Sequence, residues 1–201
     1  WMFGRDLVNW NNNFTWAKWV TPSRDLISAF KQEGDEVRFK ESIVYYDCNW
    51  SNYYPSDNYP FMYKCRSANS SIIKYRYADV LLLKAEALIM QDTPDLEGAA
   101  DIIDEVRDRA KLGALPTSVR SNKNVLLNAL LKERRLELAF EGQRWFDLVR
   151  LDKVEEVMNA VYAKDSGRKA QIYTFDKNSY RLPIPQSVID ANDKIHQNPG
   201  Y

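Results

Sequence analysis

Apolar side chains recur every three or four residues through the middle of the chain. The recurrence is cleanest over 93–113, which opens with a Thr93-Pro94 pair typical of a helix start and closes at Gly113. This pattern predicts an amphipathic helix that buries one face. The residues of that face are Ala99, Ile102, Ile103, Val106 and Ala110.

The segment before it, 71–90, also reads as a core helix, in which the small side chains of Ala85 and Ala87 permit close packing. Because the link to the next helix is short, the two should form an antiparallel helical hairpin. The expected buried face consists of Tyr77, Val80, Leu81, Lys84 and Leu88.

A second pair of helices is predicted at 124–141 and 144–161, separated by Gly142. Two hairpins in succession indicate a helical-repeat architecture, in which each pair covers an apolar face of its neighbour. The fold class is therefore mainly α.

The flanking regions carry weaker patterns. A short helix is expected from a Thr21 cap and Pro22 to Gly34. From residue 37 to 64 the chain is rich in Tyr, Asn, Ser and Pro, which predicts a long loop with a strand near 44–46. We interpret 1–201 as one region with a loop-rich part (1–70), helical pairs (71–163) and a loop and tail (164–201), with a short helical turn beginning at Pro185.

The composition excludes several function classes. The 28 basic and 28 acidic residues give no net charge, so we expect no nucleic-acid partner. One histidine and no glycine-rich loop leave little material for a zinc site, a Ser-His-Asp triad or a nucleotide site, so we expect no cofactor or metal. Cys48 and Cys65 either close one loop as a disulfide or remain free thiols.

The segment 130–150 combines many charges with an apolar face. Glu133, Glu137 and Glu141 are spaced four apart, as on one side of a helix. A glycosidase needs two carboxylates that face each other, with one kept protonated, and neighbouring arginines should instead hold these carboxylates ionised. We favour an ionic network that fixes one helix on the next. Its expected basic members are Arg134, Arg135 and Arg144, and its expected apolar partners are Leu131, Leu136, Leu138, Phe140, Trp145, Phe146 and Leu148.

Aromatic residues outside the helices lack helical spacing. Trp and Tyr rings stack on the flat faces of sugars, and Asn side chains can bind hydroxyl groups. The alternative is that these rings anchor long loops to the body of the protein. The candidate ligand-binding residues are Trp10, Asn12, Trp16, Trp19, Trp50 and Tyr53.

The order of motifs resembles the C-terminal part of the SusD/RagB family. The segments are "PSRDLISAF", "KYRYADVLLLKAEAL", "LLKERRLELAFEGQRWFDLVR" and a terminal "LPIPQSVIDANDKIHQNPGY". The resemblance implies tetratricopeptide-like helical hairpins with long irregular loops and few short strands. It also implies that the N-terminal part of the family fold, with its lipidated cysteine, is absent from this sequence.

The resemblance implies a function as well. Members of that family are surface-exposed outer-membrane lipoproteins of the Bacteroidetes, which bind glycans without catalysis and pass them to a SusC-type TonB-dependent transporter. Contact with the membrane is then expected only through a lipid anchor outside this chain. Two alternatives stay open: peptide binding, as in RagB-like nutrient uptake proteins, and a helical-repeat module that holds a partner protein.

Overall fold

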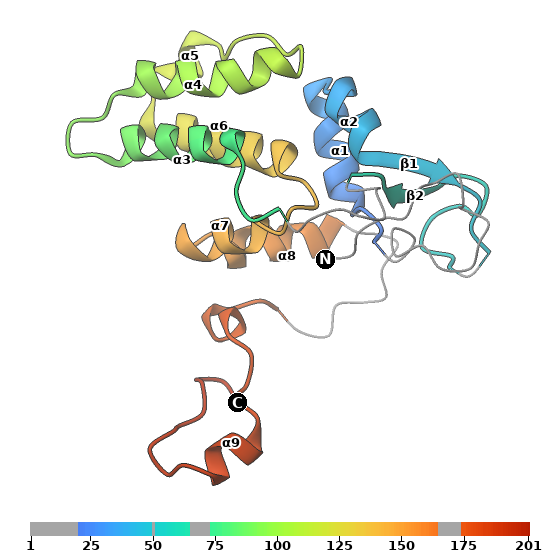
Figure 1. Ribbon diagram of the computed structural model, residues 1–201, viewed down its shortest axis with the longest axis vertical. Coiled ribbons are helices and arrows are strands. Elements are labelled where there is room, and N and C mark those ends of the chain that lie inside the picture. Colours follow the sequence, from blue (N-terminus) through green and yellow to red (C-terminus); the bar gives the residue numbers. More distant parts are fainter. Residues whose placement is uncertain (1–19, 50, 65–72, 165–173) are drawn as a thin grey trace. The chain divides into compact units, whose positions relative to one another are not determined.

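The computed structural model describes residues 20–49, 51–64, 73–164 and 174–201 (Figure 1). Most of these residues are helical, which confirms the mainly α fold class. The chain divides into two compact units, Trp1–Arg144 and Trp145–Tyr201, and each is described by itself. The predicted division into a loop-rich part, helical pairs and a tail, with boundaries at 70 and 163, stays a prediction.

Two short helices, α1 (Arg24–Glu33) and α2 (Glu36–Ser42), open the described part of the first unit. The Ser23 hydroxyl caps α1 by accepting a hydrogen bond from the Leu26 N–H at 3.1 Å, so the prediction of Thr21 as the cap is wrong. Gly34 ends the helix in the left-handed conformation (φ 68°), as predicted.

Helix α2 is missing from the predicted elements, which placed a loop there. Asp35 caps it by accepting a hydrogen bond from the Arg38 N–H at 3.1 Å. Its sequence, EVRFKES, is short and highly charged, so it shows no apolar stripe. The feature of the sequence that indicates α2 is the Gly34-Asp35 pair, because Gly34 ends α1 and Asp35 caps α2.

A two-stranded antiparallel sheet follows directly. Strand β1 (Ile43–Tyr46) pairs with β2 (Tyr59–Met62), with Ile43 opposite Met62 and Tyr46 opposite Tyr59. The strand predicted near 44–46 is thus confirmed. All four residues of β2 are buried, so the strand that follows the loop is packed into the protein.

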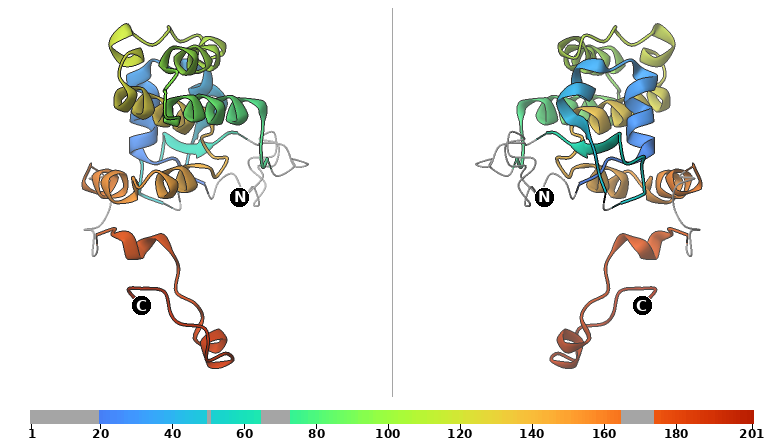
Figure 2. Two further views of the ribbon diagram at one scale, coloured as in Figure 1. Left: turned by 90° about the vertical axis from the view of Figure 1, so that its left-hand side faces the viewer. Right: turned by 90° about the vertical axis from the view of Figure 1, so that its right-hand side faces the viewer.

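The main core of the first unit lies among α3 (Tyr77–Met90), α4 (Leu96–Arg109) and α6 (Lys123–Glu137), with the short α5 (Thr117–Arg120) beside them. Helices α3 and α4 lie side by side as the predicted hairpin (Figure 1). Both views of Figure 2 show the blue α1 and α2 against the green-to-yellow α3 to α6. The buried apolar residues of this core are Leu82, Ala85, Ile89, Ala99, Ala100, Ile103, Val106, Leu126 and Leu130.

The stripe predicted on α4 is confirmed, apart from Ile102, which is half-buried. The predicted Thr93-Pro94 start is wrong, because Asp95 caps the helix by accepting a hydrogen bond from the Gly98 N–H at 2.9 Å. The helix ends at Arg109, before the predicted stop.

The buried face of α3 differs from the predicted one. The helix starts only at Tyr77, which is 71% exposed, and Val80 is 53% exposed. Apolar residues occur on nearly every side of this helix, so spacing alone does not identify the side that meets α4 and α6. The buried side consists of Asp79, Leu82, Ala85 and Ile89.

The two helices predicted for the second pair are shorter than expected. Helix α6 ends at Glu137, and Phe140 and Gly142 adopt left-handed backbone in the turn that follows. In the second unit, α7 (Arg144–Arg150) and α8 (Val154–Lys164) replace the single helix predicted for 144–161, because Asp152 takes a positive φ of 52°. No helix in the described ranges is both long and apolar enough to cross a membrane.

In the second unit, two side-chain amides each bind both the N–H and the carbonyl of a distant residue. Asn159 donates to the Phe175 carbonyl and accepts from its N–H, each at 2.9 Å. Gln197 likewise accepts from the Ile184 N–H at 2.7 Å and donates to its carbonyl at 2.9 Å. These paired bonds imitate the exchange between two strands and hold the tail that carries α9 (Gln186–Asp190), which follows Pro185 as predicted.

The corrected face of α3 can be tested with two adjacent leucines. Leu82 is fully buried, so Leu82→Ala should lower the free energy of unfolding by about 2–5 kcal/mol. Leu83 is 38% exposed, and Leu83→Ala should cost less than about 1 kcal/mol. Urea unfolding followed by circular dichroism measures both, and equal losses would contradict the observed orientation.

Candidate ligand-binding site

The loop between β1 and β2 forms a closed turn around an open cavity. The Cys48 N–H donates to the Ser56 carbonyl at 2.7 Å, and the Asn58 N–H donates to the Pro55 carbonyl at 3.3 Å. The first of these bonds joins the two ends of the loop close to the paired strands, and the second closes a turn just before β2.

Four aromatic rings form a continuous cluster from this loop into the interior. Tyr53 meets Tyr54 edge-on with ring centres 4.9 Å apart, and Tyr54 meets Tyr59 at 5.5 Å. Tyr59 then packs against the fully buried Phe61 at 5.0 Å. The first two pairs are edge-to-face, and such pairs stabilise by about 0.5–1.5 kcal/mol each beyond their buried area.

Arg24 of α1 ties the outer end of this cluster to the helices. Its guanidinium carbon lies 4.0 Å from the centre of the Tyr53 ring and 4.7 Å from that of Tyr54, within the range of cation–π contacts. Arg24 also donates to the Tyr53 carbonyl, and the Tyr54 hydroxyl donates to the Pro22 carbonyl at 2.9 Å. The two tyrosines are thus fixed before any ligand arrives.

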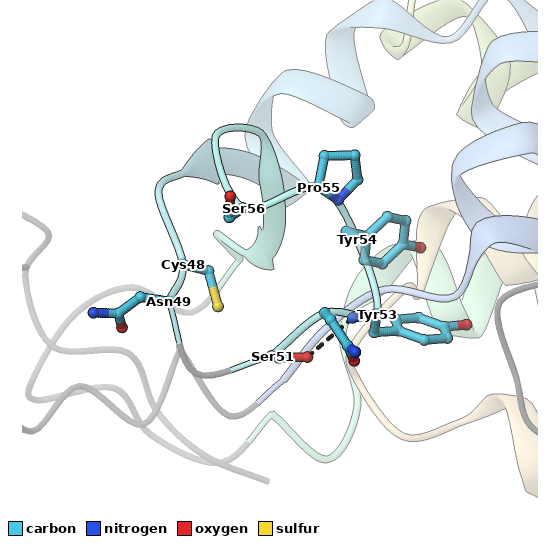
Figure 3. Close-up of a pocket in the computed structure, with 8 residues that line it drawn as sticks. Cys48, Asn49, Ser51, Tyr53, Tyr54, Pro55 and Ser56 are labelled. Carbon is cyan, nitrogen blue, oxygen red and sulfur yellow. Dashed lines mark hydrogen bonds between the residues drawn. The ribbon is translucent and has the colours of Figure 1, made fainter.

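The cavity beside the loop has a volume of about 890 Å³, within the roughly 300–1,000 Å³ usual for small-molecule sites. Figure 3 shows the Tyr53 and Tyr54 rings next to each other, with Cys48, Asn49 and Ser56 on the opposite side of the loop. Aromatic rings beside hydroxyl and amide groups are suited to binding a sugar. The lining residues are Cys48, Asn49, Ser51, Asn52, Tyr53, Tyr54, Pro55 and Ser56.

Of the predicted ligand-binding residues, the structure places Tyr53 at this cavity, where it is half-buried. Trp10, Asn12, Trp16, Trp19 and Trp50 lie outside the described residues, so their roles stay predictions. Cys65 also lies outside them, and the alternative between a disulfide and free thiols stays open.

Sequence reasoning missed Asn49, Ser51 and Asn52 as lining residues, and it noted Tyr54 among the aromatic residues outside the helices without making it a candidate. The signal for Tyr54 is the same as for Tyr53, an aromatic residue without helical spacing in a Pro-rich loop. The polar residues become recognisable only once the hairpin brings Cys48 and Ser56 together.

The carboxylates of 130–150 form a buried ionic cluster. Glu133, Glu137 and Glu141 are at most 6% exposed. Arg38 of α2 donates to Glu133 at 2.6 Å and to Glu137 at 3.1 Å, and it also pairs with its helix cap, Asp35. The prediction that these glutamates belong to an internal ionic network is confirmed.

Glu137 is the most heavily bound member of this cluster. Its carboxylate accepts hydrogen bonds from Arg38, from Arg76 at 2.6 Å and from Arg109. Burial alone would raise the pKa of Glu137, but these guanidinium groups outweigh it and hold the pKa below the ordinary 4.5. Burial raises the pKa of Glu133, although Arg38 and Arg107 oppose the rise. The arginines therefore favour the ionised form of both carboxylates, as expected, and they outweigh burial at Glu137 but not at Glu133.

The predicted basic residues make contacts with other segments. Arg134 pairs with Asp79 of α3 at 2.8 Å, and Arg135 pairs with Asp25 of α1. Arg144 donates to the Leu131 carbonyl at 3.2 Å. The actual partners come from segments distant in sequence, because residues adjacent on α6 point to different neighbouring helices.

The predicted burial of the apolar residues is confirmed in part, and each unit is taken by itself. In the first unit Leu131, Leu136 and Leu138 are buried and Phe140 is half-buried; in the second unit Leu148 is buried, Trp145 is half-buried and Phe146 is 65% exposed. Across the described ranges, no group of three or more His, Cys, Asp or Glu side chains is placed to hold a metal ion. The ion pairs of the cluster join α2, α4 and α6 with Lys64 and Arg76.

Comparison with known proteins identifies the family. The sequence model of the SusD family matches residues 56–201. The chain belongs to the SusD family.

Two SusD-like proteins of Formosa agariphila are similar in sequence. One is 43% identical over 99 residues, which cover 46% of this chain and 19% of the relative. The other is 36% identical over 143 residues, which cover 68% of this chain and 27% of the relative. The chain thus spans about a quarter or less of these relatives' length.

Solved structures show the same fold. A SusD superfamily protein from Bacteroides vulgatus, 22% identical, superposes with a TM-score of 0.68 over 90% of this chain and 44% of the other. A surface glycan-binding protein A from Bacteroides uniformis, 25% identical, superposes with a TM-score of 0.55 over 80% of this chain and 37% of the other. These neighbours confirm the SusD-like arrangement of helical hairpins.

The role of Glu137 can be tested through the pH dependence of stability. Glu137→Gln should lower the free energy of unfolding by about 3–5 kcal/mol at pH 7, because Arg38 and Arg76 each lose one of their charged partners inside the protein. Since the folded-state pKa lies below 4.5, the contribution of Glu137 is present above pH 4.5 and is lost as the pH falls below it.

The difference between parent and variant should therefore shrink on acidification below pH 4.5. Urea unfolding at a series of pH values measures this difference, with the exposed Glu105→Gln on α4 as the matched control. A variant as stable as the parent at pH 7 would show that the ion pairs do not contribute.

Proposed function

We propose that this protein binds glycans at the bacterial cell surface without covalent chemistry and delivers them to a SusC-type TonB-dependent transporter. Membership of the SusD family over residues 56–201 carries the proposal. The likeness to a surface glycan-binding protein and the aromatic cavity beside Tyr53 and Tyr54 support it.

The cavity suits capture followed by release. An open site binds a sugar through stacking on an aromatic ring and a few hydrogen bonds, so the affinity per sugar unit is modest. Because Arg24 already holds the two tyrosines, little conformational entropy is lost on binding. Modest affinity allows a captured glycan to be passed on.

The buried carboxylates do not favour catalysis. Glycoside hydrolysis requires a protonated carboxyl and a second carboxylate on opposite sides of the scissile bond. Burial raises the pKa of Glu133, which is the direction that a general acid needs, but Glu133 is 2% exposed and bound by Arg38. A polysaccharide does not reach it, so we assign the cluster to the scaffold.

The proposal places the protein at the outer membrane as a surface-exposed lipoprotein, anchored through a lipid outside this chain. Mass spectrometry of the protein from its native membrane tests the anchor, and co-purification with a transporter of the SusC type tests the partner. Recovery from the periplasm without a lipid would contradict this location.

A glycan array run beside a peptide panel separates the proposed ligand class from the RagB-like alternative. The expected result is saturable binding to at least one oligosaccharide and no binding to peptides. Peptide binding without any carbohydrate signal would overturn the proposal.

Tyr53 should contribute directly to glycan binding. Tyr53→Ala should weaken the affinity about three- to tenfold, since a stacking contact is worth about 0.5–1.5 kcal/mol. Tyr53→Phe retains the ring and should bind nearly as well as the parent. Tyr77→Ala, an exposed tyrosine on α3, is the matched control for isothermal titration calorimetry.

Trp10 and Trp16 test glycan capture against a helical-repeat interaction module. Under the proposed function, Trp10→Ala and Trp16→Ala should abolish glycan binding, because each removes a stacking ring. A partner protein held in a helical groove would still bind both variants. Pull-down of such a partner with unchanged glycan binding would favour the interaction module.

A further inference from the structure

A second cavity lies next to the ionic cluster, away from the loop between β1 and β2. Its volume is about 260 Å³, just below the ~300 Å³ at which drug-sized ligands fit. It therefore has room for one small group. Its lining residues are Val37, Arg38, Glu41, Ser42, Lys64, Arg76, Arg109, Ala110 and Glu137.

Basic side chains outnumber acidic ones around this cavity. Four of the lining residues are cationic, whereas Glu41 and Glu137 are acidic. Glu137 is already bound by three guanidinium groups, so its charge is shared among them. Burial lowers the pKa of Lys64 and the neighbouring Arg76 adds to this, although Glu141 opposes it. The lining itself thus carries more cationic than acidic side chains, while Asp35, Glu133 and Glu141 behind it pair with Arg38, Lys64 and Arg76.

A buried nitrogen of Arg38 also indicates a place for a hydrogen-bond acceptor at this cavity. Its side chain is 8% exposed, and Nε and Nη1 bind Asp35, Glu133 and Glu137. Its Nη2 is buried and has no hydrogen-bond partner among the residues that the structure describes. An unsatisfied buried donor on a charged group costs about 1–3 kcal/mol or more, so an acceptor that enters the cavity would relieve a real penalty.

We propose that this cavity binds a small oxyanion, the carboxylate or sulfate group of an acidic sugar unit or a free inorganic anion of the same chemistry. The oxyanion accepts hydrogen bonds from Arg38 Nη2 and from the charged ends of Lys64, Arg76 and Arg109. Guanidinium groups bind carboxylate and sulfate-like oxygens through paired, charge-assisted hydrogen bonds. The buried Ser42 hydroxyl is one further donor in the lining.

This cavity and its lining residues are separate from the aromatic cavity beside Tyr53 and Tyr54. Tyr53→Ala should leave oxyanion binding unchanged. Failure of the glycan proposal and failure of this one can therefore be told apart.

Calorimetric titration with glucuronate, sulfate and phosphate tests the proposal, at constant ionic strength maintained with chloride. Glucuronate or an inorganic oxyanion should bind saturably with a Kd of about 1 mM or lower, whereas neutral glucose should not. Binding of glucuronate identifies an acidic sugar as the source, and binding of sulfate or phosphate alone identifies a free anion.

Two exposed positions allow the cavity to be altered without removing a core side chain. Arg109→Gln removes one charge and should weaken binding about tenfold or more, while Arg109→Lys should retain most of it. Val37→Trp should fill the entrance and abolish binding, since Val37 is 38% exposed. Arg181→Gln, an exposed arginine of the second unit, is the matched control.

The proposal is overturned if none of the three anions binds saturably. It is also overturned if Val37→Trp and Arg109→Gln bind the anions as the parent does. Thermal unfolding of each variant without ligand shows that it is folded.

Discussion

The carboxylate of Glu137 is the point at which the segments of the first unit meet. It binds Arg38 from α2, Arg76 from the residue before α3, and Arg109 from the end of α4. Its main-chain carbonyl accepts hydrogen bonds from Lys64 and Arg76. Burying so many charges costs several kcal/mol per ion, and the cost is offset only when every partner is in place. The cluster therefore contributes little net stability. Its effect is to require each segment to lie where its charged groups reach their partners.

Helix α6 is central because its two sides carry different interactions. Leu126 and Leu130 enter the apolar core with α3 and α4, whereas Glu133 and Glu137 face the arginines of α2 and α4. Arg134 adds a buried pair with Asp79 on the side of α3. Apolar packing brings the helices together without specifying their register, and directional ion pairs then select one arrangement.

The sequence predicted where helices and strands lie along the chain better than it predicted which residues contact each other between them. The α4 stripe, the end of α1 at Gly34 and the strand near 44–46 follow from spacing and turn chemistry, which are local properties. The buried side of α3 does not, because a helix that is apolar on several sides is oriented by its neighbours. The same reason explains the ionic cluster: four-residue spacing identified the glutamates, but Arg38 lies 95 residues before Glu133 and no local pattern connects them. At the candidate site, aromatic spacing indicated Tyr53, whereas the contact with Arg24 depends on how α1 packs.

The scaffold and the aromatic loop are connected through α1. On one side of this helix, Asp25 pairs with Arg135 and Glu33 with Arg107 and Lys132, so α6 and α4 fix its position. On the other, Arg24 holds the rings of Tyr53 and Tyr54. A shallow sugar site has few contacts, so its affinity depends on rings that are already oriented before the ligand binds. Under the proposed function, the charges of 130–150 would affect ligand binding without contacting the ligand, because they hold α1 in place, and Arg24 of α1 holds the aromatic rings of the loop.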